Sequence, residues 1–249
     1  MRLNGKIAIV TGAGSGFGKS TAKLFAEEGA RVCVADIEAA RAKRVTDEIG
    51  GAAVAAVGDV SKASGIETIV ETTRAAFGDA DIIVNNAGVT HRNQPMLEVD
   101  EETFDKIYGV NVKALYLMAR ATVPAMRSKG GGSIINVSST AALRPRPGLV
   151  WYNGSKGAAN VISKAMALEL APDNIRVNAI CPVMGETGLL EDFMGMPDTP
   201  ENRARFLATT PLGRLSKPRD IAQAAVWLAS DEAAFVTGIE LPVDGGRCV

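Results

Sequence analysis

Seven short apolar segments, separated by amphipathic stretches, constrain the fold of this 249-residue chain more than any other feature. They are rich in Ile, Val and Ala and mostly lack alternation, which is typical of strands buried on both faces of a parallel sheet. They span Lys6–Thr11, Arg31–Asp36, Ala53–Val57, Asp81–Asn85, Ser133–Ser138, Ile175–Cys181 and Ile239–Val243. Helical periodicity fills the gaps over Gly18–Glu28, Ile37–Ile49, Gly65–Phe77, Glu102–Ser128, Tyr152–Leu170 and Pro218–Ala229. The alternation predicts one α/β domain, residues 1–249, with a doubly wound, seven-stranded parallel sheet covered by helices on both faces.

Charge and composition exclude several classes of partner. Lys and Arg number 27 against 28 Asp and Glu, so the net charge of −1 gives no reason to expect nucleic acid or an anionic membrane. The N-terminal apolar run is too short for a signal peptide, and no window approaches a membrane span. The three cysteines, Cys33, Cys181 and Cys248, form no CxxC pair, and no cluster has zinc spacing. We expect a cytoplasmic protein without a bound metal, with Cys33 in the core.

One segment, residues 183–212, departs from the strand–helix rhythm. It is long for a connection between a helix and a strand, and it carries several Met, Leu and Phe side chains. Long insertions between elements are usually functional lids or disordered segments. The apolar content favours a substrate-binding lid.

The first strand runs into a glycine-rich turn, "TGAGSGFG", with glycines at 12, 14, 16 and 18. Such a turn before a helix presents backbone N–H groups and the positive end of the helix dipole to a phosphate, although it can also be only a tight connection. The second strand ends in Asp36, eighteen residues after Gly18. A carboxylate there can accept hydrogen bonds from both ribose hydroxyls of an adenosine and would repel a 2′-phosphate. Together with the non-basic Ser15, Asp36 favours NAD over NADP, unless Asp36 merely caps the helix that follows it.

Tyr152 and Lys156 lie four residues apart in a predicted helix, so their side chains share one face. A tyrosine that exchanges a proton near neutral pH needs a pKa about 3 units below its usual value, which takes roughly 4 kcal/mol of preference for the phenolate. We expect the Lys156 ammonium, together with the positive ring of an oxidised nicotinamide, to supply this preference.

These features resemble the short-chain dehydrogenase/reductase family along nearly the whole chain. The matching motifs, in order, are "TGAGSGFG", "GDV" at 58–60, "NNAG" at 85–88, Asn111 in "GVNV", "INVSS" at 135–139, "YNGSK" at 152–156 and "FVTGIELPVDGG" at 235–246. The resemblance implies a single-domain Rossmann fold, a nicotinamide cofactor, a small-molecule substrate and a homotetramer.

The resemblance also assigns roles to individual residues. The catalytic residues it implies are Asn111, Ser139, Tyr152 and Lys156, with Ser138 as the alternative to Ser139. Asn111 would kink its helix and position a water, and Thr187 would bind the nicotinamide carboxamide. Val183 replaces the usual glycine after Pro182 and adds bulk there. The expected cofactor-binding residues are Gly12, Ser15, Gly16, Phe17, Gly18, Asp36, Ile37, Asp59, Val60, Asn86, Ala87, Gly88, Tyr152, Lys156, Pro182, Val183 and Thr187.

The function that follows is an NAD-dependent dehydrogenase that interconverts a secondary alcohol and its ketone or aldehyde, with a sugar, polyol, hydroxy acid or steroid-like substrate. One alternative is an NADPH-dependent 3-oxoacyl-carrier-protein reductase, against which Asp36 counts; another is an NAD(H)-sensing protein on the same fold. Arg144 and Arg146 are exposed turn residues or attract an anionic substrate or acyl carrier. Trp151 packs in the core or lines the substrate mouth, and the single histidine, His91, is assigned no role.

Overall fold

The computed structural model describes residues 1–185, 188 and 190–249, and its centre is one parallel sheet. The strand order is β3-β2-β1-β4-β5-β6-β7, with every neighbouring pair parallel. This confirms the predicted doubly wound architecture, and each predicted strand begins and ends within one residue of an observed one. The strands are β1 Ile7–Thr11, β2 Arg31–Asp36, β3 Ala53–Val57, β4 Ile82–Asn85, β5 Gly132–Val137, β6 Ile175–Pro182 and β7 Glu240–Val243.

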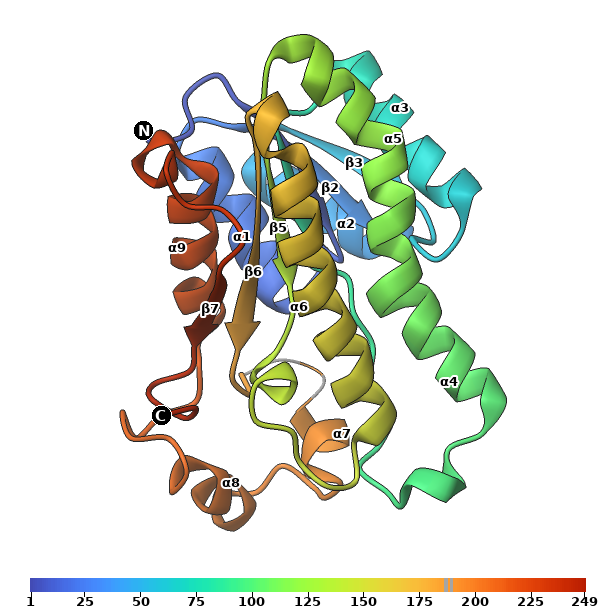
Figure 1. Ribbon diagram of the computed structural model, residues 1–249, viewed down its shortest axis with the longest axis vertical. Coiled ribbons are helices and arrows are strands. Elements are labelled where there is room, and N and C mark those ends of the chain that lie inside the picture. The colour runs from blue at the N-terminus through green and yellow to red at the C-terminus, as the bar shows by residue number, and fades with distance from the viewer. Residues whose placement is uncertain (186–187, 189) are drawn as a thin grey trace.

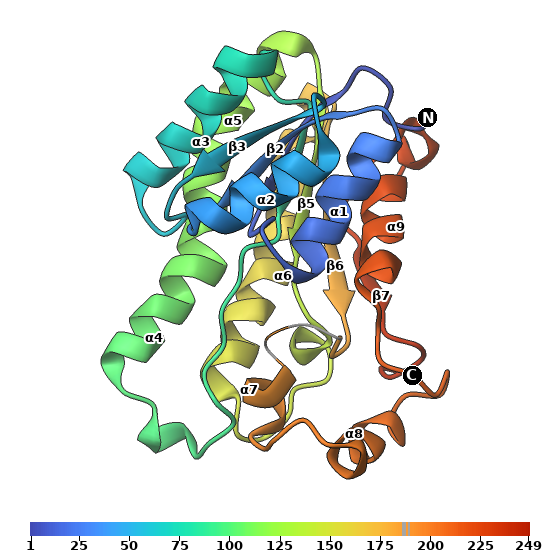
Figure 2. The same ribbon diagram turned by 180° about the vertical axis from the view of Figure 1, so that it is seen from behind.

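Helices cover both faces of the sheet (Figures 1 and 2). One layer holds α1 Gly16–Glu27, α2 Ala39–Ile49 and α9 Pro218–Ala229, which pack on one apolar cluster. The other layer holds α3 Ala63–Phe77, α5 Ala114–Lys129 and α6 Val150–Leu170, which pack on a second cluster. The described residues also include five short turns: η1 Met96–Glu98, η2 Gly109–Lys113, η3 Thr140–Ala142, η4 Ala171–Asp173 and η5 Asp231–Ala233.

The central strands are mostly apolar because both of their faces are covered. All five residues of β1 are buried, and its alternate side chains divide between the two clusters. Burying a Val or Ile side chain contributes roughly 1.5–3 kcal/mol, so this strand alone anchors both helical layers. Cys33 is fully buried in β2, as expected.

The predicted helix over Glu102–Ser128 is two helices. Helix α4, Glu101–Tyr108, and α5 are joined by η2, a π-helical turn that contains the buried Asn111. The Asn111 side chain bonds to neighbouring segments, and a helix widens into a π-turn frequently at functional sites. The resemblance had implied a kink at this residue.

The segment 183–212 forms two short helices, α7 Leu190–Met194 and α8 Pro200–Leu207, at the lower end of the molecule in Figure 1. Leu190 and Met194 pack with Leu215 in a small apolar cluster separate from the two main ones. Thr187, the expected carboxamide contact, lies outside the described residues. None of the helices described is long and apolar enough to cross a membrane.

The carboxyl ends of β1 and β4 lie side by side at the point where the strand order reverses. The chain leaves β1 toward β2 on one side and leaves β4 toward β5 on the other, which opens a crevice between the two connections. Ligands of open α/β sheets bind in this crevice.

Candidate active site

A cavity of about 540 Å³ occupies this crevice. It extends from the end of β2, past the glycine-rich turn, to the N-terminal part of α6. Sixteen of the predicted site residues line it: Gly12, Ser15, Gly16, Phe17, Asp36, Ile37, Asp59, Val60, Asn86, Ala87, Gly88, Ser139, Tyr152, Lys156, Pro182 and Val183. The topology therefore brings together residues that lie as far apart in sequence as Gly12 and Val183.

The glycine-rich turn supplies one end of the cavity. Gly12 and Gly16 adopt left-handed backbone angles, φ 61° and 52°, which favour glycine. Ser15 precedes α1 but makes no side-chain cap, so the N–H groups of the first turn remain available to an anion. Gly18 does not line the cavity: a Cβ at Gly18 would lie 2.3 Å from the Gly12 carbonyl oxygen. Its role is to let α1 approach the end of β1.

Asp36 lies at the carboxyl end of β2 with its side chain on the turn. Its Oδ2 accepts a hydrogen bond from the Gly14 backbone N–H at 2.9 Å, and its Oδ1 accepts one from Glu38 N–H at 3.0 Å. The helix-capping alternative is wrong, because α2 begins at Ala39 with Glu38 as its cap residue. Asp36 instead ties β2 to the glycine-rich turn and presents its carboxylate to the cavity.

Tyr152 and Lys156 both lie in α6 with buried side chains. The Lys156 Nζ is 5.9 Å from the centre of the Tyr152 ring and donates a hydrogen bond to the Val137 carbonyl at 2.8 Å. Burial raises the pKa of Tyr152 to about 12, opposed by its contact with Ser139 and by the positive charge of Arg146. Burial lowers the pKa of Lys156 to about 8.

The expected lowering of the Tyr152 pKa by Lys156 is therefore not a property of the protein alone. Desolvation of the phenolate outweighs the nearby cations, and Lys156 is itself desolvated. By itself the chain holds Tyr152 as a neutral hydroxyl that can donate a proton.

Asn111 is buried and does not line the cavity. Its Nδ2 donates to the Val89 carbonyl and to the Ser155 hydroxyl, each at 2.9 Å, while its Oδ1 accepts from Val89 N–H at 2.9 Å. Ser155 in turn donates to the Tyr152 carbonyl at 2.8 Å. Asn111 thus fixes the loop after β4 against the first turns of α6.

The two serines that follow β5 differ in environment. Ser138 is buried and donates its hydroxyl to the Lys156 carbonyl at 3.0 Å, which occupies it structurally. Ser139 caps η3 by accepting from Ala141 N–H at 3.0 Å and contacts the Tyr152 hydroxyl. Its position beside Tyr152 supports Ser139 over Ser138 as the group that meets a substrate oxygen.

Other residues of the cavity carry weaker sequence signals. Phe193 of α7 packs edge-on against Tyr152 with ring centres 5.1 Å apart, and Arg144, Arg146 and Arg247 also line the space. The exposed-turn interpretation is wrong for Arg146, which is partly buried. Nothing local in the sequence around Arg247 connects it with Tyr152, because the two are 95 residues apart.

Trp151 and His91 lie outside this lining. Trp151 packs edge-on against Phe104 and donates its Nε1–H to the Met96 carbonyl at 3.0 Å. His91 is buried with its Nδ1 2.8 Å from the Arg92 carbonyl oxygen. Trp151 is therefore a packing residue rather than part of the substrate mouth.

The residues of the cavity fit a nicotinamide dinucleotide. An uncapped helix start suits the diphosphate, the Asp36 carboxylate suits a ribose, and the Lys156 ammonium lies near Tyr152 for a second ribose. A Cβ at Gly88 would come within 3.3 Å of the Lys156 Nζ, so the glycine leaves this region open. In the part of the chain that the structure describes, no group of His, Cys, Asp and Glu side chains could hold a metal ion.

A model of a known protein family matches residues 12–247 of the chain. The matching family model is described as enoyl-(acyl carrier protein) reductase. The match includes the glycine-rich turn, the Tyr152–Lys156 pair and the C-terminal segment with Arg247.

Similar proteins extend over the full length of the chain. The 4-formylbenzenesulfonate dehydrogenase of Comamonas testosteroni is 48% identical over 99% of both chains. The 3-oxoacyl-[acyl-carrier-protein] reductase of Thermotoga maritima is 39% identical over 100% of both chains. A crystal structure of a 3-ketoacyl-(acyl-carrier-protein) reductase from Brucella melitensis, complexed with NADH, superposes with a TM-score of 0.94 at 47% identity and covers 99% of this chain and 100% of that one.

Proposed function

The chain belongs to the short-chain dehydrogenase/reductase family of oxidoreductases, and we propose that it is an NAD(H)-dependent enzyme interconverting an alcohol and its ketone or aldehyde. The observation that carries the proposal is one cavity lined both by a phosphate-binding turn and by Tyr152, Ser139 and Lys156. The residues that suit a cofactor and the residues that suit proton transfer therefore share one cavity. A similarity of fold alone would not establish this function.

The protein groups position the substrate and move a proton. Ser139 donates a hydrogen bond to the substrate oxygen and holds it toward the Tyr152 hydroxyl. In reduction, Tyr152 gives its proton to the developing alkoxide; in oxidation, it takes the alcohol proton. Lys156, held by the Val137 carbonyl, stabilises the phenolate form. When bound, the nicotinamide supplies or accepts the hydride.

The preference for NAD rests on Asp36. Its carboxylate faces the cavity from the end of β2, where a 2′-phosphate would meet a negative charge. The Brucella relative, 47% identical, was crystallised with NADH. Both observations support NAD over NADP. The Brucella relative is itself named a carrier-protein reductase, so the choice of cofactor does not separate the two substrate classes.

Substrate identity is proposed at the level of a small alcohol or aldehyde. A relative 48% identical to this chain is named for 4-formylbenzenesulfonate, an aromatic aldehyde. The cavity offers an apolar wall of the right kind, with Phe193, Leu149 and Met184 near Tyr152. A substrate panel therefore begins with 4-formylbenzenesulfonate, 4-formylbenzoate and 4-methylbenzaldehyde, followed by sugars, polyols, hydroxy acids and steroids.

Replacement of Tyr152 by Phe tests the mechanism. It removes only the hydroxyl and is expected to lower kcat by about 10²–10⁴-fold, the range that a positioned acid or base contributes. Binding of NADH, followed by its fluorescence, stays unchanged. Tyr116→Phe is the matched control, because Tyr116 is exposed on α5 and should turn over substrate normally.

Two results would contradict the proposal. Activity of Tyr152→Phe at the wild-type level would remove Tyr152 from the chemistry. Tight NADH binding by the wild-type protein, without oxidation or reduction of any compound in the panel, would favour the cofactor-sensing alternative.

A further inference from the structure

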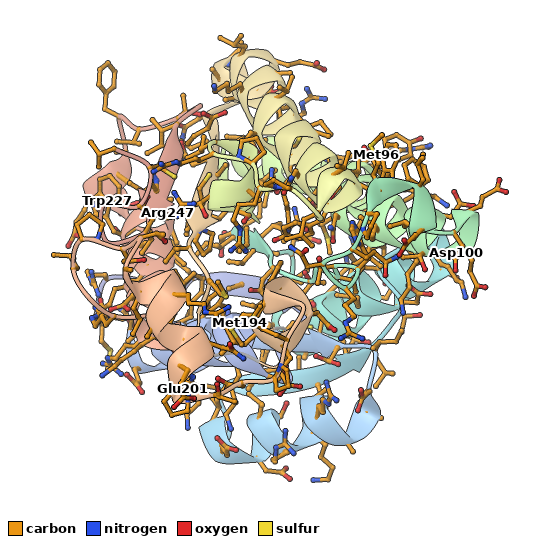
Figure 3. All side chains as sticks on the ribbon, turned by 90° about the horizontal axis from the view of Figure 1, so that it is seen from below. Met96, Asp100, Met194, Glu201, Trp227 and Arg247 are labelled. Atoms are coloured by element: carbon orange, nitrogen blue, oxygen red, sulfur yellow. The ribbon has the colours of Figure 1, made fainter. Side chains whose placement is uncertain are left out.

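Three arginines converge on the end of the cavity that holds Tyr152. Arg144 and Arg146 lie in the loop between η3 and α6, and Arg247 lies in the segment after β7. Figure 1 shows the C-terminus and α7 toward the lower end of the molecule, and Figure 3, a view from below, labels Arg247 of the C-terminal segment and Met194 of α7. The loop and the C-terminal segment are joined by a hydrogen bond from the Arg144 Nη1 to the Arg247 carbonyl at 2.8 Å.

The position of Arg247 is unfavourable for the protein alone. Its Nη1 is buried and has no hydrogen-bond partner among the described residues. A buried donor without an acceptor costs about 1–3 kcal/mol, and more when the group is charged. The carboxylate nearest in sequence, Asp244, already accepts from the backbone N–H groups of Gly246 and Cys248 at 2.9 and 2.8 Å.

Arg146 adds a second positive charge close by. Burial lowers the pKa of Arg146, and the charge of Arg247 lowers it further, so the two guanidinium groups repel each other. Among the described residues that line the cavity, the carboxylates are Asp36 and Asp59, which belong to the ends of β2 and β3. Asp36 is held at the glycine-rich turn by Gly14 N–H, and Asp59 accepts from the Ser61 hydroxyl and pairs with Lys62.

A ligand that carries a negative charge would give the Arg247 guanidinium an acceptor and would offset the repulsion between Arg146 and Arg247. We propose that Arg146 and Arg247 form a subsite for an anionic group, a carboxylate or a sulfonate, carried by the substrate at a distance from its reacting carbon. Guanidinium groups bind both anions through paired N–H donors in a planar fork. Arg146 also lies close enough to Tyr152 for its positive charge to act on the hydroxyl. One small molecule can therefore extend from the subsite to the Tyr152 hydroxyl.

The walls between the two ends favour a small substrate with an apolar body. Phe193, Leu149, Met184 and Leu215 line the cavity, and Phe193 covers the Tyr152 ring. The buried Arg247 Nη1 can be contacted only by an anion that enters the cavity. A carrier protein would instead contact charges at the rim of the cavity. The inference names the substrate class of the proposed oxidoreductase and rests on that function.

Binding of simple anions tests the subsite without knowledge of the substrate. Benzoate and benzenesulfonate are titrated by calorimetry into the NADH complex of the wild-type protein, with benzamide as the neutral counterpart. We expect both anions to bind at least tenfold more tightly than benzamide. Arg247→Met and Arg146→Met should each lose at least tenfold in anion affinity, and Arg247→Lys should recover part of it because it keeps the charge without the fork.

Control measurements separate this subsite from folding and from the cofactor. Arg219→Met removes an exposed charge of α9 and should leave anion binding unchanged. The NADH affinity of Arg247→Met should match the wild type, and its thermal midpoint should be no lower, because the variant removes a buried donor without an acceptor. A loss of NADH affinity would mean that the arginines serve the cofactor phosphates, and would overturn the proposal. Equal affinity for benzoate and benzamide would also overturn it.

The panel of substrates distinguishes the two proposals. If the anionic aldehydes and the neutral one are reduced with equal kcat/KM, the subsite is wrong while the oxidoreductase stands. If anions bind through Arg247 but nothing is turned over, the oxidoreductase assignment fails while the subsite stands. Binding of a 3-oxoacyl carrier protein without binding of the small anions would overturn the small-molecule assignment.

Discussion

Tyr152 and Lys156 show how burial decides the protonation of an acid–base pair. A neutral tyrosine with a pKa near 12 and a lysine with a pKa near 8 are both products of desolvation, and both oppose the charged forms. Activity at neutral pH then requires additional stabilisation of the phenolate from groups that enter the cavity. In the reducing direction Tyr152 donates a proton. The neutral hydroxyl that this step requires is already the form that burial favours.

The lowered pKa of Lys156 makes a prediction about stability. Its folded value of about 8 lies below the usual 10.5, so between these values the unfolded chain binds more protons than the folded one. Stability contributed by this group therefore rises with pH across that window. The shift corresponds to at most about 3 kcal/mol. Lys156→Met lacks the titrating group and should lack this gain.

Urea unfolding of both proteins at pH 7.5 and 9.5 measures the effect. The difference in free energy of unfolding, wild type minus Lys156→Met, should increase with pH. The raised pKa of Tyr152 acts in the opposite sense only between about 10 and 12, outside the range measured. Parallel pH profiles for the two proteins would contradict the lowered pKa of Lys156.

At the scale of elements, the end of β2 and the glycine-rich turn act as one unit. Asp36 accepts from Gly14 N–H and leaves its remaining lone pairs for a ligand in the cavity. A second unit is the π-turn at Asn111, whose side chain joins the loop after β4 to α6 through Val89 and Ser155. Both units use a polar side chain to lock two segments around the site.

The charge of Asp36 should decide the choice between the two nicotinamide cofactors. Asp36→Asn keeps the shape and an acceptor for Gly14 N–H but removes the negative charge. We expect the ratio of kcat/KM for NAD⁺ to that for NADP⁺ to fall at least tenfold, since loss of one charge-assisted contact and relief of one repulsion act together. Initial rates with both cofactors measure this ratio, and Asp59→Asn serves as a comparison at the neighbouring strand end. An unchanged ratio in Asp36→Asn would assign the preference to other groups.

At the scale of the whole molecule, several large apolar side chains remain uncovered. Val161 and Leu168 of α6 are 67% and 81% exposed, and Phe235, near the C-terminus, is fully exposed. Large exposed apolar side chains are candidates for contacts between subunits. The homotetramer that the family resemblance implies stays a prediction.

Light scattering of the purified protein tests the assembly. We expect a mass four times the 26.0 kDa of one chain at micromolar concentration. The double variant Val161→Glu, Leu168→Glu places charges on the exposed face of α6 and should reduce the mass, while Thr68→Glu, at an exposed position of α3, controls for added charge alone. A monomeric wild-type protein would remove the tetramer from consideration.

Much of this organisation could be predicted from the amino-acid sequence. The strands followed from apolar runs that suit burial on both faces, and the strand β2 and the helix α9 have the predicted ends. Tyr152, Lys156, Asp36 and the glycines were found because spacing along one strand, turn or helix fixes where such side chains point. Local periodicity is sufficient for features of this kind.

Only the tertiary structure decided the rest, because those features depend on contacts between distant segments. The pKa values of Tyr152 and Lys156 depend on what buries them, and burial is not encoded in their spacing. The same holds for Arg146 and Arg247: the sequence offered binding of an anion as one of two alternatives for Arg146, and nothing in the sequence singled out Arg247. The sheet order brings the loop after η3 and the segment after β7 to one end of one cavity, where two guanidinium groups meet beside Tyr152. By itself the sequence determined the fold and the pairing of Tyr152 with Lys156 on one helix face. The tertiary structure then decided that the positive charges of Arg146 and Arg247 lie beside this pair.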